Sequence, residues 1–120
     1  MDVTARVSYL PISAQKLRLV CDQVRGMDAD QALTVLRYMP HKGAKFTFKL
    51  VESAIANAEE NFELSRRDLF IAQLMADEGP SQRRVKAGAR GRYKPRTKRT
   101  AHLRLVLREY DYEETVTDGA

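Results

Sequence analysis

The chain has 120 residues, of which 43% are apolar and 31% charged, and its formal net charge is +5. This length suggests one domain with a modest core, and the apolar content excludes wholesale disorder. No apolar run is long enough for a transmembrane helix, and the first residues, MDVTARVSYLP, lack the apolar core of a secretory signal. Because Cys21 is the single cysteine, an intrachain disulfide is excluded and a reducing compartment is expected.

The charge is divided unevenly along the chain. Residues 1–78 contain ten basic and eleven acidic residues, whereas residues 79–108 contain eleven basic and no acidic ones. Five acidic residues follow from position 109. The basic character therefore belongs to one segment, which is the pattern of a localised surface for binding a polyanion.

The first predicted element is a half-buried strand over residues 3–10. Apolar and polar residues alternate there, and a period of two is typical of a strand with one face toward a core. The residues expected to face inward are Val3, Ala5, Val7 and Tyr9.

Three helices are predicted to follow. Residues 14–25 form the first, with Ser13 as N-cap and Gly26 as the stop signal. Asp28 caps a second short helix that ends before Pro40, and a third runs from about residue 41 to 61. The inward-facing apolar residues are Leu17, Val20, Cys21 and Val24 in the first helix, Ala32, Leu33 and Leu36 in the second, and Phe46, Leu50, Val51, Ala54, Ile55 and Ala58 in the third. Cys21 is thus expected to be a buried core thiol rather than a nucleophile or a metal ligand.

Two further strands are predicted over residues 69–76 and 100–110. In the latter, the inward positions are Ala101, Leu103, Leu105 and Leu107. The predicted fold class is α+β, with three helices packed on a small three-stranded antiparallel sheet. Residues 1–110 form one domain in this interpretation, and the acidic residues 111–120 form a solvated, frayed tail.

The stretch GPSQRRVKAGARGRYKPRTKRTAH, residues 79–102, holds nine Lys or Arg residues and no Asp or Glu. It lies between two strands that can pair directly, so it is expected to be a long β-hairpin, with its turn near Arg90 and Gly91. Each arm of about eleven residues would reach roughly 35 Å at about 3.3 Å per residue. Such an arm repels itself in water, and the phosphates of a nucleic acid would reverse that repulsion.

Other interpretations of this segment are a solvated linker, a targeting signal or a disordered tail. Anchoring at both ends in one sheet argues against all three. Further cations on the helices point to the same polyanion less specifically: Lys16, Arg18 and Arg25 on the first helix, and Lys42, Lys45 and Lys49 at i, i+3 and i+7 on the third. For these an ordinary solvated helix face stays open as the alternative.

Sequence patterns of catalytic chemistry are missing. His41 and His102 lie far apart, there is no Cys or His cluster with zinc spacing, and no phosphate loop of the form G-x-x-x-x-G-K-[ST] occurs. Asp77 and Glu78 are adjacent in a strand and are expected to face opposite sides. We therefore expect no enzymatic activity, no metal, no cofactor and no small-molecule substrate.

Four separated motifs resemble the large-subunit ribosomal protein twenty-two family, in its bacterial or organellar form. In chain order they are SAQKLRLVCDQVRG (13–26), ESAIANAEEN (52–61), ADEGPSQRR (76–84) and ARGRYKPRTKRTAH (89–102). The resemblance covers about residues 5–108. It implies an α+β body at the ribosome surface and a long β-hairpin that threads into the large-subunit rRNA, with a tip that forms part of the wall of the polypeptide exit tunnel. It also implies a role in assembly of the large subunit.

The resemblance assigns rRNA contacts to residues of the matched motifs. On the body these are Ser13, Lys16 and Arg18, and along the hairpin Arg83, Arg84, Arg96, Lys98, Arg99 and His102. Arg25, Lys42, Lys45 and Lys94 join the predicted rRNA-binding set because of their charge and position. The implied tunnel tip consists of Lys86, Ala87, Gly88, Ala89, Arg90, Gly91 and Arg92, where Ala87-Gly88 replaces the Pro-Arg pair of the usual family pattern.

The implied partners are large-subunit rRNA, neighbouring large-subunit proteins and the nascent polypeptide, on a cytoplasmic or organellar ribosome and without a membrane. A free-standing nucleic-acid-binding regulator that uses the same basic hairpin is the alternative function. An enzyme acting on RNA is a distant third.

Overall fold

The computed structural model of the chain describes residues 2–87 and 93–110, with residues 82–87 and 93–98 described through their backbone. Its elements in chain order are β1 (Asp2–Leu10), α1 (Ala14–Val24), α2 (Ala29–Tyr38), α3 (Lys42–Phe62), the short 3₁₀ helix η1 (Arg66–Asp68), β2 (Leu69–Glu78), β3 (Gln82–Ala87), β4 (Tyr93–Lys98) and β5 (Ala101–Glu109). The predicted fold class is confirmed, and each predicted helix and strand of the body is present. The expected acidic tail, residues 111–120, lies outside the described residues.

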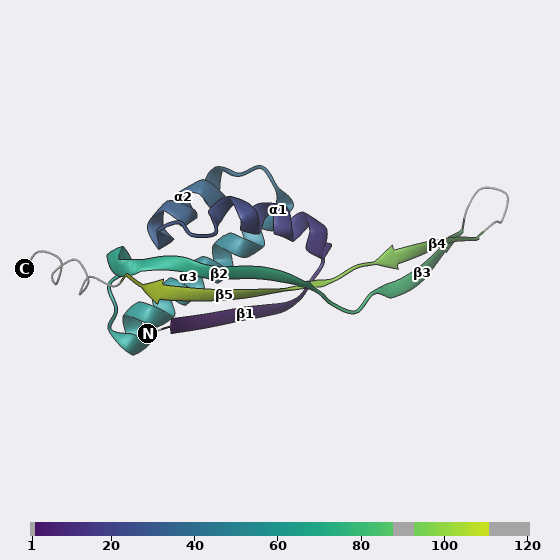
Figure 1. Cartoon of the computed structure of the whole chain (residues 1–120). Helices are drawn as coiled ribbons and strands as arrows, with labels where there is room; N and C mark the ends of the chain where they lie inside the picture. Colours follow the sequence, from purple (N-terminus) through teal and green to yellow (C-terminus); the bar gives the residue numbers. More distant parts are fainter. Residues whose placement is uncertain (1, 88–92, 111–120) are drawn as a thin grey trace, which may run out of the picture.

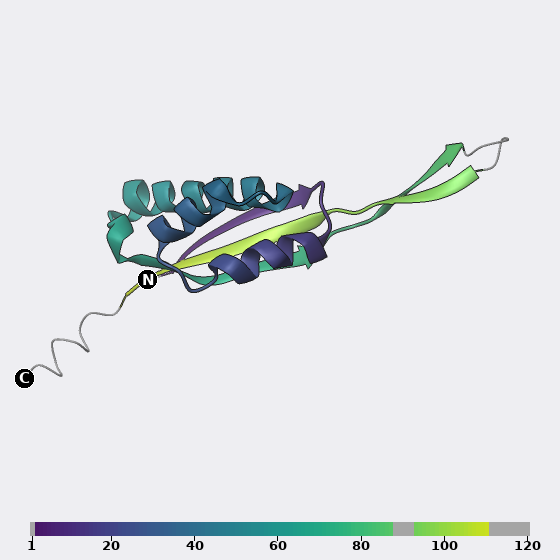
Figure 2. The same cartoon turned by 90° about the horizontal axis from the view of Figure 1, so that it is seen from above.

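The body, which we define as residues 2–78 and 101–110, has two layers. Its antiparallel sheet has the strand order β1-β5-β2, so that β5 is the central strand. The helices cover one face of the sheet, with α1 beside β2 and α3 across β1 and β5 (Figures 1 and 2). The helices α1 and α3 begin at the same end of the body, where α3 residue Gly43 lies against the side chains of Leu17 and Ile12.

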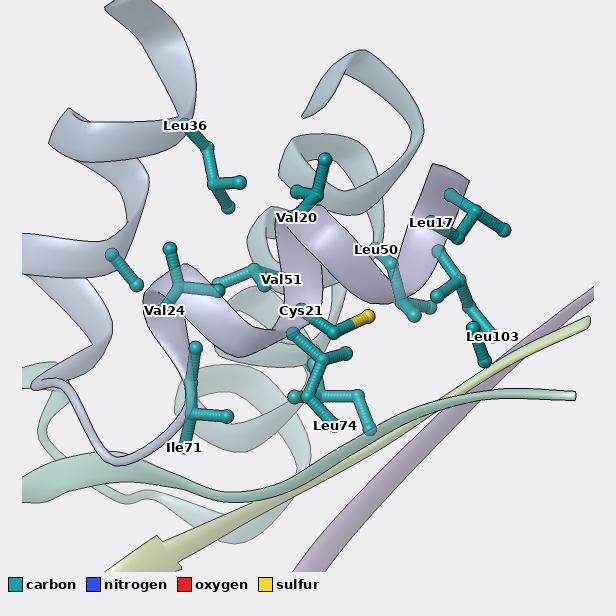
Figure 3. Packing of buried hydrophobic residues seen from close by; sticks show 14 of the residues in the cluster. Leu17, Val20, Cys21, Val24, Leu36, Leu50, Val51, Ile71, Leu74 and Leu103 are labelled. Atoms are coloured by element: carbon teal, nitrogen blue, oxygen red, sulfur yellow. The ribbon is translucent and has the colours of Figure 1, made fainter. Parts of the chain in front are cut away.

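The core lies between these two layers and follows the predicted stripes. In α1 the buried residues are Ala14, Leu17, Val20, Cys21 and Val24, and in β5 the alternating residues Ala101, Leu103, Leu105 and Leu107 have no exposed surface. Figure 3 shows Cys21 among leucine and valine side chains of α1, α3 and the sheet. The predicted buried thiol is confirmed, and burial raises the pKa of Cys21 to about 11 because the thiolate would lose its water.

The expectation that Tyr9 faces the core is wrong. The pairing of β1 with β5 shifts by one residue between Val7 and Leu10, and Tyr9 has a backbone φ of +59°. A one-residue irregularity moves the following side chains to the other face of the sheet. Tyr9 is consequently 66% exposed, and Leu10 is buried in its place.

The outer edge of β2 is covered by the connection between α1 and α2. The amide of Gly26 donates to the Ile71 carbonyl at 2.9 Å, the amide of Ile71 donates to the Met27 carbonyl at 2.9 Å, and Asp28 forms an isolated bridge with Phe70. Covering these groups removes part of an edge that would otherwise be open to pairing with another strand.

Strands β3 and β4 form a separate two-stranded antiparallel sheet, which we call the ribbon, and it extends away from the body (Figures 1 and 2). The molecule measures 78 × 25 × 21 Å, and its radius of gyration is 18.6 Å. A compact domain of this length would have a radius of gyration of about 14 Å. The predicted projecting hairpin is therefore present, although the turn expected near Arg90 and Gly91 lies outside the described residues.

Candidate nucleic-acid interface

The ribbon joins the body through a short neck, residues 79–81 and 99–100. The last pair of the body sheet is Glu78 with Ala101, and the first pair of the ribbon is Gln82 with Lys98. Within the neck the Gly79 amide donates to the Thr100 carbonyl at 2.9 Å, and the Thr100 hydroxyl donates to the Pro80 carbonyl at 2.7 Å. Pro80 has no amide to offer the ladder, so the sheet is interrupted here.

Gly79 is needed for this close approach of the two neck strands. A Cβ added to it would lie 2.6 Å from the Thr100 hydroxyl oxygen and 3.1 Å from the His102 Cε1 atom. The imidazole of His102 in turn accepts a hydrogen bond at Nδ1 from the Tyr9 amide, at 3.0 Å. The predicted site residue His102 thus holds β1 against the base of the ribbon.

A hollow of about 400 Å³ lies between the neck and the start of α1. Its lining comes from three parts of the chain: Ser13, Ala14, Gln15, Arg18, Glu78, Gly79, Ser81, Arg99 and Thr100. Ser13 is the N-cap of α1, as predicted, and its hydroxyl accepts from the Lys16 amide at 3.4 Å. The first turn of α1 has no acidic residue.

The chemistry of this hollow suits an anion. The positive end of a helix dipole and its free amides attract negative charge, and Arg18 and Arg99 add two guanidinium groups, whereas Glu78 is the one carboxylate in the lining. Predicted site residues Ser13, Arg18 and Arg99 are thereby brought together. Gln15, Ser81 and Thr100 were not predicted, because an uncharged polar residue gives no signal until the topology places it beside others.

Arg18 and Arg25 also bind the body itself. The Nε of Arg18 donates to the Ala76 carbonyl at 3.1 Å, and Arg25 donates to the Leu74 carbonyl from Nε at 3.2 Å and from Nη2 at 2.7 Å. Arg25 is further paired with Asp22 at 2.7 Å. Both arginines therefore fasten α1 to the edge of β2, a role that their charge alone did not predict.

The predicted lysines of α3 lie on a second surface. Lys42, Lys45 and Lys49 are exposed and border a groove of about 650 Å³ whose apolar lining includes Phe46 and Phe48. The Arg37 guanidinium lies over the Phe48 ring, 5.7 Å from its centre. The structure places these lysines toward the N-terminal end of α3 and gives them no contact with the neck hollow.

The pairing of β3 with β4 sets cations directly opposite one another. The register pairs Arg84 with Arg96 and Lys86 with Lys94, and it continues through Pro95, which pairs with Val85. A proline is tolerated there because both strands of a two-stranded ribbon are edges. Like charges on directly opposite residues destabilise a sheet, so the negative charges of a binding partner would stabilise this ribbon. Tip residues Lys86 and Ala87 end β3, whereas Gly88 to Arg92 lie outside the described residues.

The end of the body opposite the ribbon is acidic. We call it the far end; its acidic residues are Asp2, Asp28, Asp30, Glu59, Glu60, Glu63, Asp68 and Glu109. Several of them are paired internally. Arg108 donates to Asp2 at 2.9 Å, a bond that lowers the pKa of that carboxyl, and Arg66 donates to Glu59 at 3.0 Å. Asp28 begins α2 as predicted, but its side chain makes no capping bond and instead accepts from the Tyr110 hydroxyl.

Within residues 2–87 and 93–110, none of the helices is long and apolar enough to cross a membrane. In the same part of the chain no three His, Cys, Asp or Glu side chains are grouped as metal ligands would be.

Comparison with known proteins identifies the family. The model of the family described as ribosomal protein L22p/L17e matches residues 5–108. The protein named large ribosomal subunit protein uL22 from Desulfotalea psychrophila is 45% identical over 109 residues, which cover 91% of this chain and 99% of the relative. The proteins of the same name from a Thermoanaerobacter species and from Finegoldia magna are 42% and 40% identical over 109 residues, covering 91% of this chain and 98% and 97% of the relatives. A basic ribbon on an α+β body, a family match across nearly the whole body and ribbon, and identity at this level together show that the chain belongs to the ribosomal protein L22p/L17e family.

Proposed function

We propose that this protein is a structural constituent of the large ribosomal subunit that binds large-subunit rRNA through the neck hollow and the ribbon. The main support for this proposal is the ribbon, in which Arg84 pairs with Arg96 and Lys86 pairs with Lys94. No acidic residue occurs between positions 79 and 108 to balance these charges. A ribbon of two strands is marginally stable in water even without repulsion. Phosphates that neutralise these cations release counterions and turn the repulsion into binding energy.

The body supplies a second contact in this proposal. Arg18 and Arg99 with the first amides of α1 would hold a phosphate in the neck hollow. The ribbon would extend the contact with the RNA outward, to phosphates or bases, through Arg83, Arg84, Lys94, Arg96 and Lys98. Lys16 on α1, Arg25 at the C-terminal cap of α1, and Lys42 and Lys45 on α3 would flank the RNA. His102 contributes by holding the base of the ribbon.

The finer parts of the proposal follow the relatives' family. Residues 86–92 form part of the wall of the polypeptide exit tunnel and meet the nascent chain, and the body contacts neighbouring large-subunit proteins and supports assembly of the subunit. Binding is electrostatic and structural, without catalysis or a cofactor. The protein works on the ribosome of the cytoplasm or of an organelle.

Sedimentation of cell extract through a sucrose gradient tests this function. We expect the protein in the large-subunit fractions. Its presence only in free fractions would support the alternative function, a free-standing nucleic-acid-binding regulator. Binding of the isolated protein to an rRNA fragment should depend steeply on salt. If about six phosphates are neutralised, the slope of log K against log salt concentration should be about −4 to −5, and a flat dependence would contradict the electrostatic mechanism.

Trypsin gives an independent test of ordering by RNA. The segment 80–100 holds nine basic residues, and trypsin can cleave after eight of them because Pro95 follows Lys94. We expect rapid cleavage there in the free protein and protection in the large subunit. Equal resistance in both states would show that rRNA does not order the ribbon.

A further inference from the structure

The register of the ribbon sorts its residues into two faces. In an antiparallel pair, opposite residues belong to the same face and successive residues alternate between faces. The pairs on one face are Gln82 with Lys98, Arg84 with Arg96, and Lys86 with Lys94. The pairs on the other face are Arg83 with Thr97, Val85 with Pro95, and Ala87 with Tyr93.

These two faces differ sharply in composition. Five of the six residues on the first, which we call the cationic face, are Lys or Arg. On the second, which we call the mixed face, Arg83 is the one cation and the others are apolar, aromatic or hydroxyl-bearing. The six cations of residues 82–87 and 93–98 are therefore distributed unevenly between the two faces of the ribbon.

Neither face is occupied by the body. The ribbon runs outward from the neck, away from the helices and from the three-stranded sheet (Figures 1 and 2). By register, the mixed face combines Tyr93 with the apolar residues Pro95, Val85 and Ala87. Tyrosine rings stack on nucleobases, and an arginine on the same face can do so as well.

On the basis of the proposed function, we infer that the ribbon binds RNA with two chemically distinct sides. The cationic face lies along phosphates, and the mixed face receives an unpaired nucleobase that stacks on Tyr93. The charges favour RNA as the partner of the mixed face. The ribbon is a single layer, so the five cations of the cationic face lie directly behind the mixed face, and Arg83 adds a positive charge to the mixed face itself. A protein surface would have to tolerate five uncompensated cations immediately behind it.

Adjacent arginines provide a matched test of the division. Arg83→Gln and Arg84→Gln remove the same charge from neighbouring positions on opposite faces. Binding to in vitro transcripts of large-subunit rRNA is measured for each variant over a series of salt concentrations. Arg84→Gln should reduce the steepness of the log–log slope by about 0.7 to 0.9, the value for one lost phosphate contact, whereas Arg83→Gln should leave the slope unchanged.

A second pair of variants tests the mixed face. Tyr93→Leu should weaken binding on the order of tenfold at every salt concentration without changing the slope, because stacking releases no counterion. Tyr93→Phe retains an aromatic ring and should bind like the unchanged protein. Thermal unfolding of the body serves as a folding control for all four variants, since the ribbon lies outside the core.

The outcomes separate the inference from the function on which it rests. If the unchanged protein fails to bind any transcript, the proposed function itself is wrong. If it binds with a steep salt dependence but Arg83→Gln and Arg84→Gln flatten the slope equally, the two-sided arrangement is wrong. Unchanged binding of Tyr93→Leu would likewise overturn it, because the mixed face would then contribute no stacking to RNA binding.

Discussion

The Tyr9 amide donates to His102 Nδ1 at 3.0 Å, and the two rings meet edge to face with their centres 5.0 Å apart. The residues are 93 positions apart in sequence, yet together they join β1 to the base of the ribbon. The positive φ of Tyr9 and the register shift beside it bring the amide toward the imidazole. An irregularity in the first strand therefore serves the junction from which the ribbon leaves.

Replacing His102 tests this junction. His102→Ala removes the acceptor of the Tyr9 amide and the edge-to-face contact, and we expect the free energy of unfolding to fall by about 1 kcal/mol. His102→Asn places an oxygen close to the position of Nδ1 and should recover part of the loss. Urea denaturation measures both variants, and equal stability of His102→Ala and the unchanged protein would show that the bond contributes nothing.

Gly79→Ala should disturb the neck. The added methyl group would lie 2.6 Å from the Thr100 hydroxyl oxygen, so the threonine must move and its bond to the Pro80 carbonyl must break. We expect destabilisation of about 1–3 kcal/mol in thermal unfolding, since overpacking at a fixed backbone costs this much. Thr100→Ala removes the obstructing oxygen, so the double variant should be more stable than the sum of the two single effects indicates. Strict additivity would argue against the clash.

Arg25→Lys should weaken the attachment of the C-terminal end of α1 to the edge of β2. A lysine cannot reproduce the paired donation of Arg25 to the Leu74 carbonyl, and the partly exposed site lets water replace part of the loss. We expect a decrease in unfolding free energy of about 1 kcal/mol by urea titration. Arg67→Lys, at an exposed arginine of η1, is the control and should change stability by less than about 0.5 kcal/mol. Equal effects at both positions would contradict the fastening role.

Cys21 predicts how stability depends on alkaline pH. Its folded-state pKa is about 11, against an ordinary value of 9.0. Between these two values the unfolded chain loses the thiol proton while the folded protein retains it, so stability should fall as pH rises from about 9 to 11. Cys21→Ala should show a shallower decline over this window in urea unfolding. In the native protein the thiol should also react slowly with alkylating reagents at pH 8, and rapid modification would show that the site opens easily.

Deleting the ribbon should leave the body folded. The core cluster of the described residues is made of body residues, and β3 and β4 form a sheet separate from that of the body. Replacing residues 82–98 by a short turn between Ser81 and Arg99 therefore keeps these core contacts. We expect a cooperative thermal transition and an unfolding free energy within about 0.5 kcal/mol of the full chain. RNA binding should weaken strongly in the same variant, because only the contact at the neck hollow is left. Loss of the cooperative transition would show that ribbon and body fold as one unit.

The sequence predicted the elements of this fold well where burial was periodic. The α1 stripe and the alternating residues of β5 are fully buried, because the periods of 3.6 and two report directly which side faces the core. Tyr9 was misplaced because a bulge leaves no trace in an alternating pattern. Its position depends on the pairing with a strand about 90 residues later.

The charge pattern of the sequence predicted which arginines could meet a polyanion, but it did not predict their contacts within the protein. Arg18 and Arg25 were expected to flank a polyanion, and the structure shows that both also donate to carbonyls of β2. Asp28 was recognised as the first residue before α2, but its bond to Tyr110 connects positions 82 residues apart. The two faces of the ribbon could be assigned only from the register of β3 with β4. The register depends on how the two strands align, and the composition of the segment does not determine it.

The separation of charge between the two ends also bears on how the protein reaches its partner. Acidic residues at the far end and cations of the neck and ribbon lie at opposite ends of a molecule 78 Å long. In the field of a large polyanion, such a molecule experiences a torque as well as an attraction, because one end is drawn in while the other is repelled. Collisions would be aligned before contact, with the ribbon leading, so fewer encounters would be lost to wrong orientations than for an evenly charged protein of the same net charge.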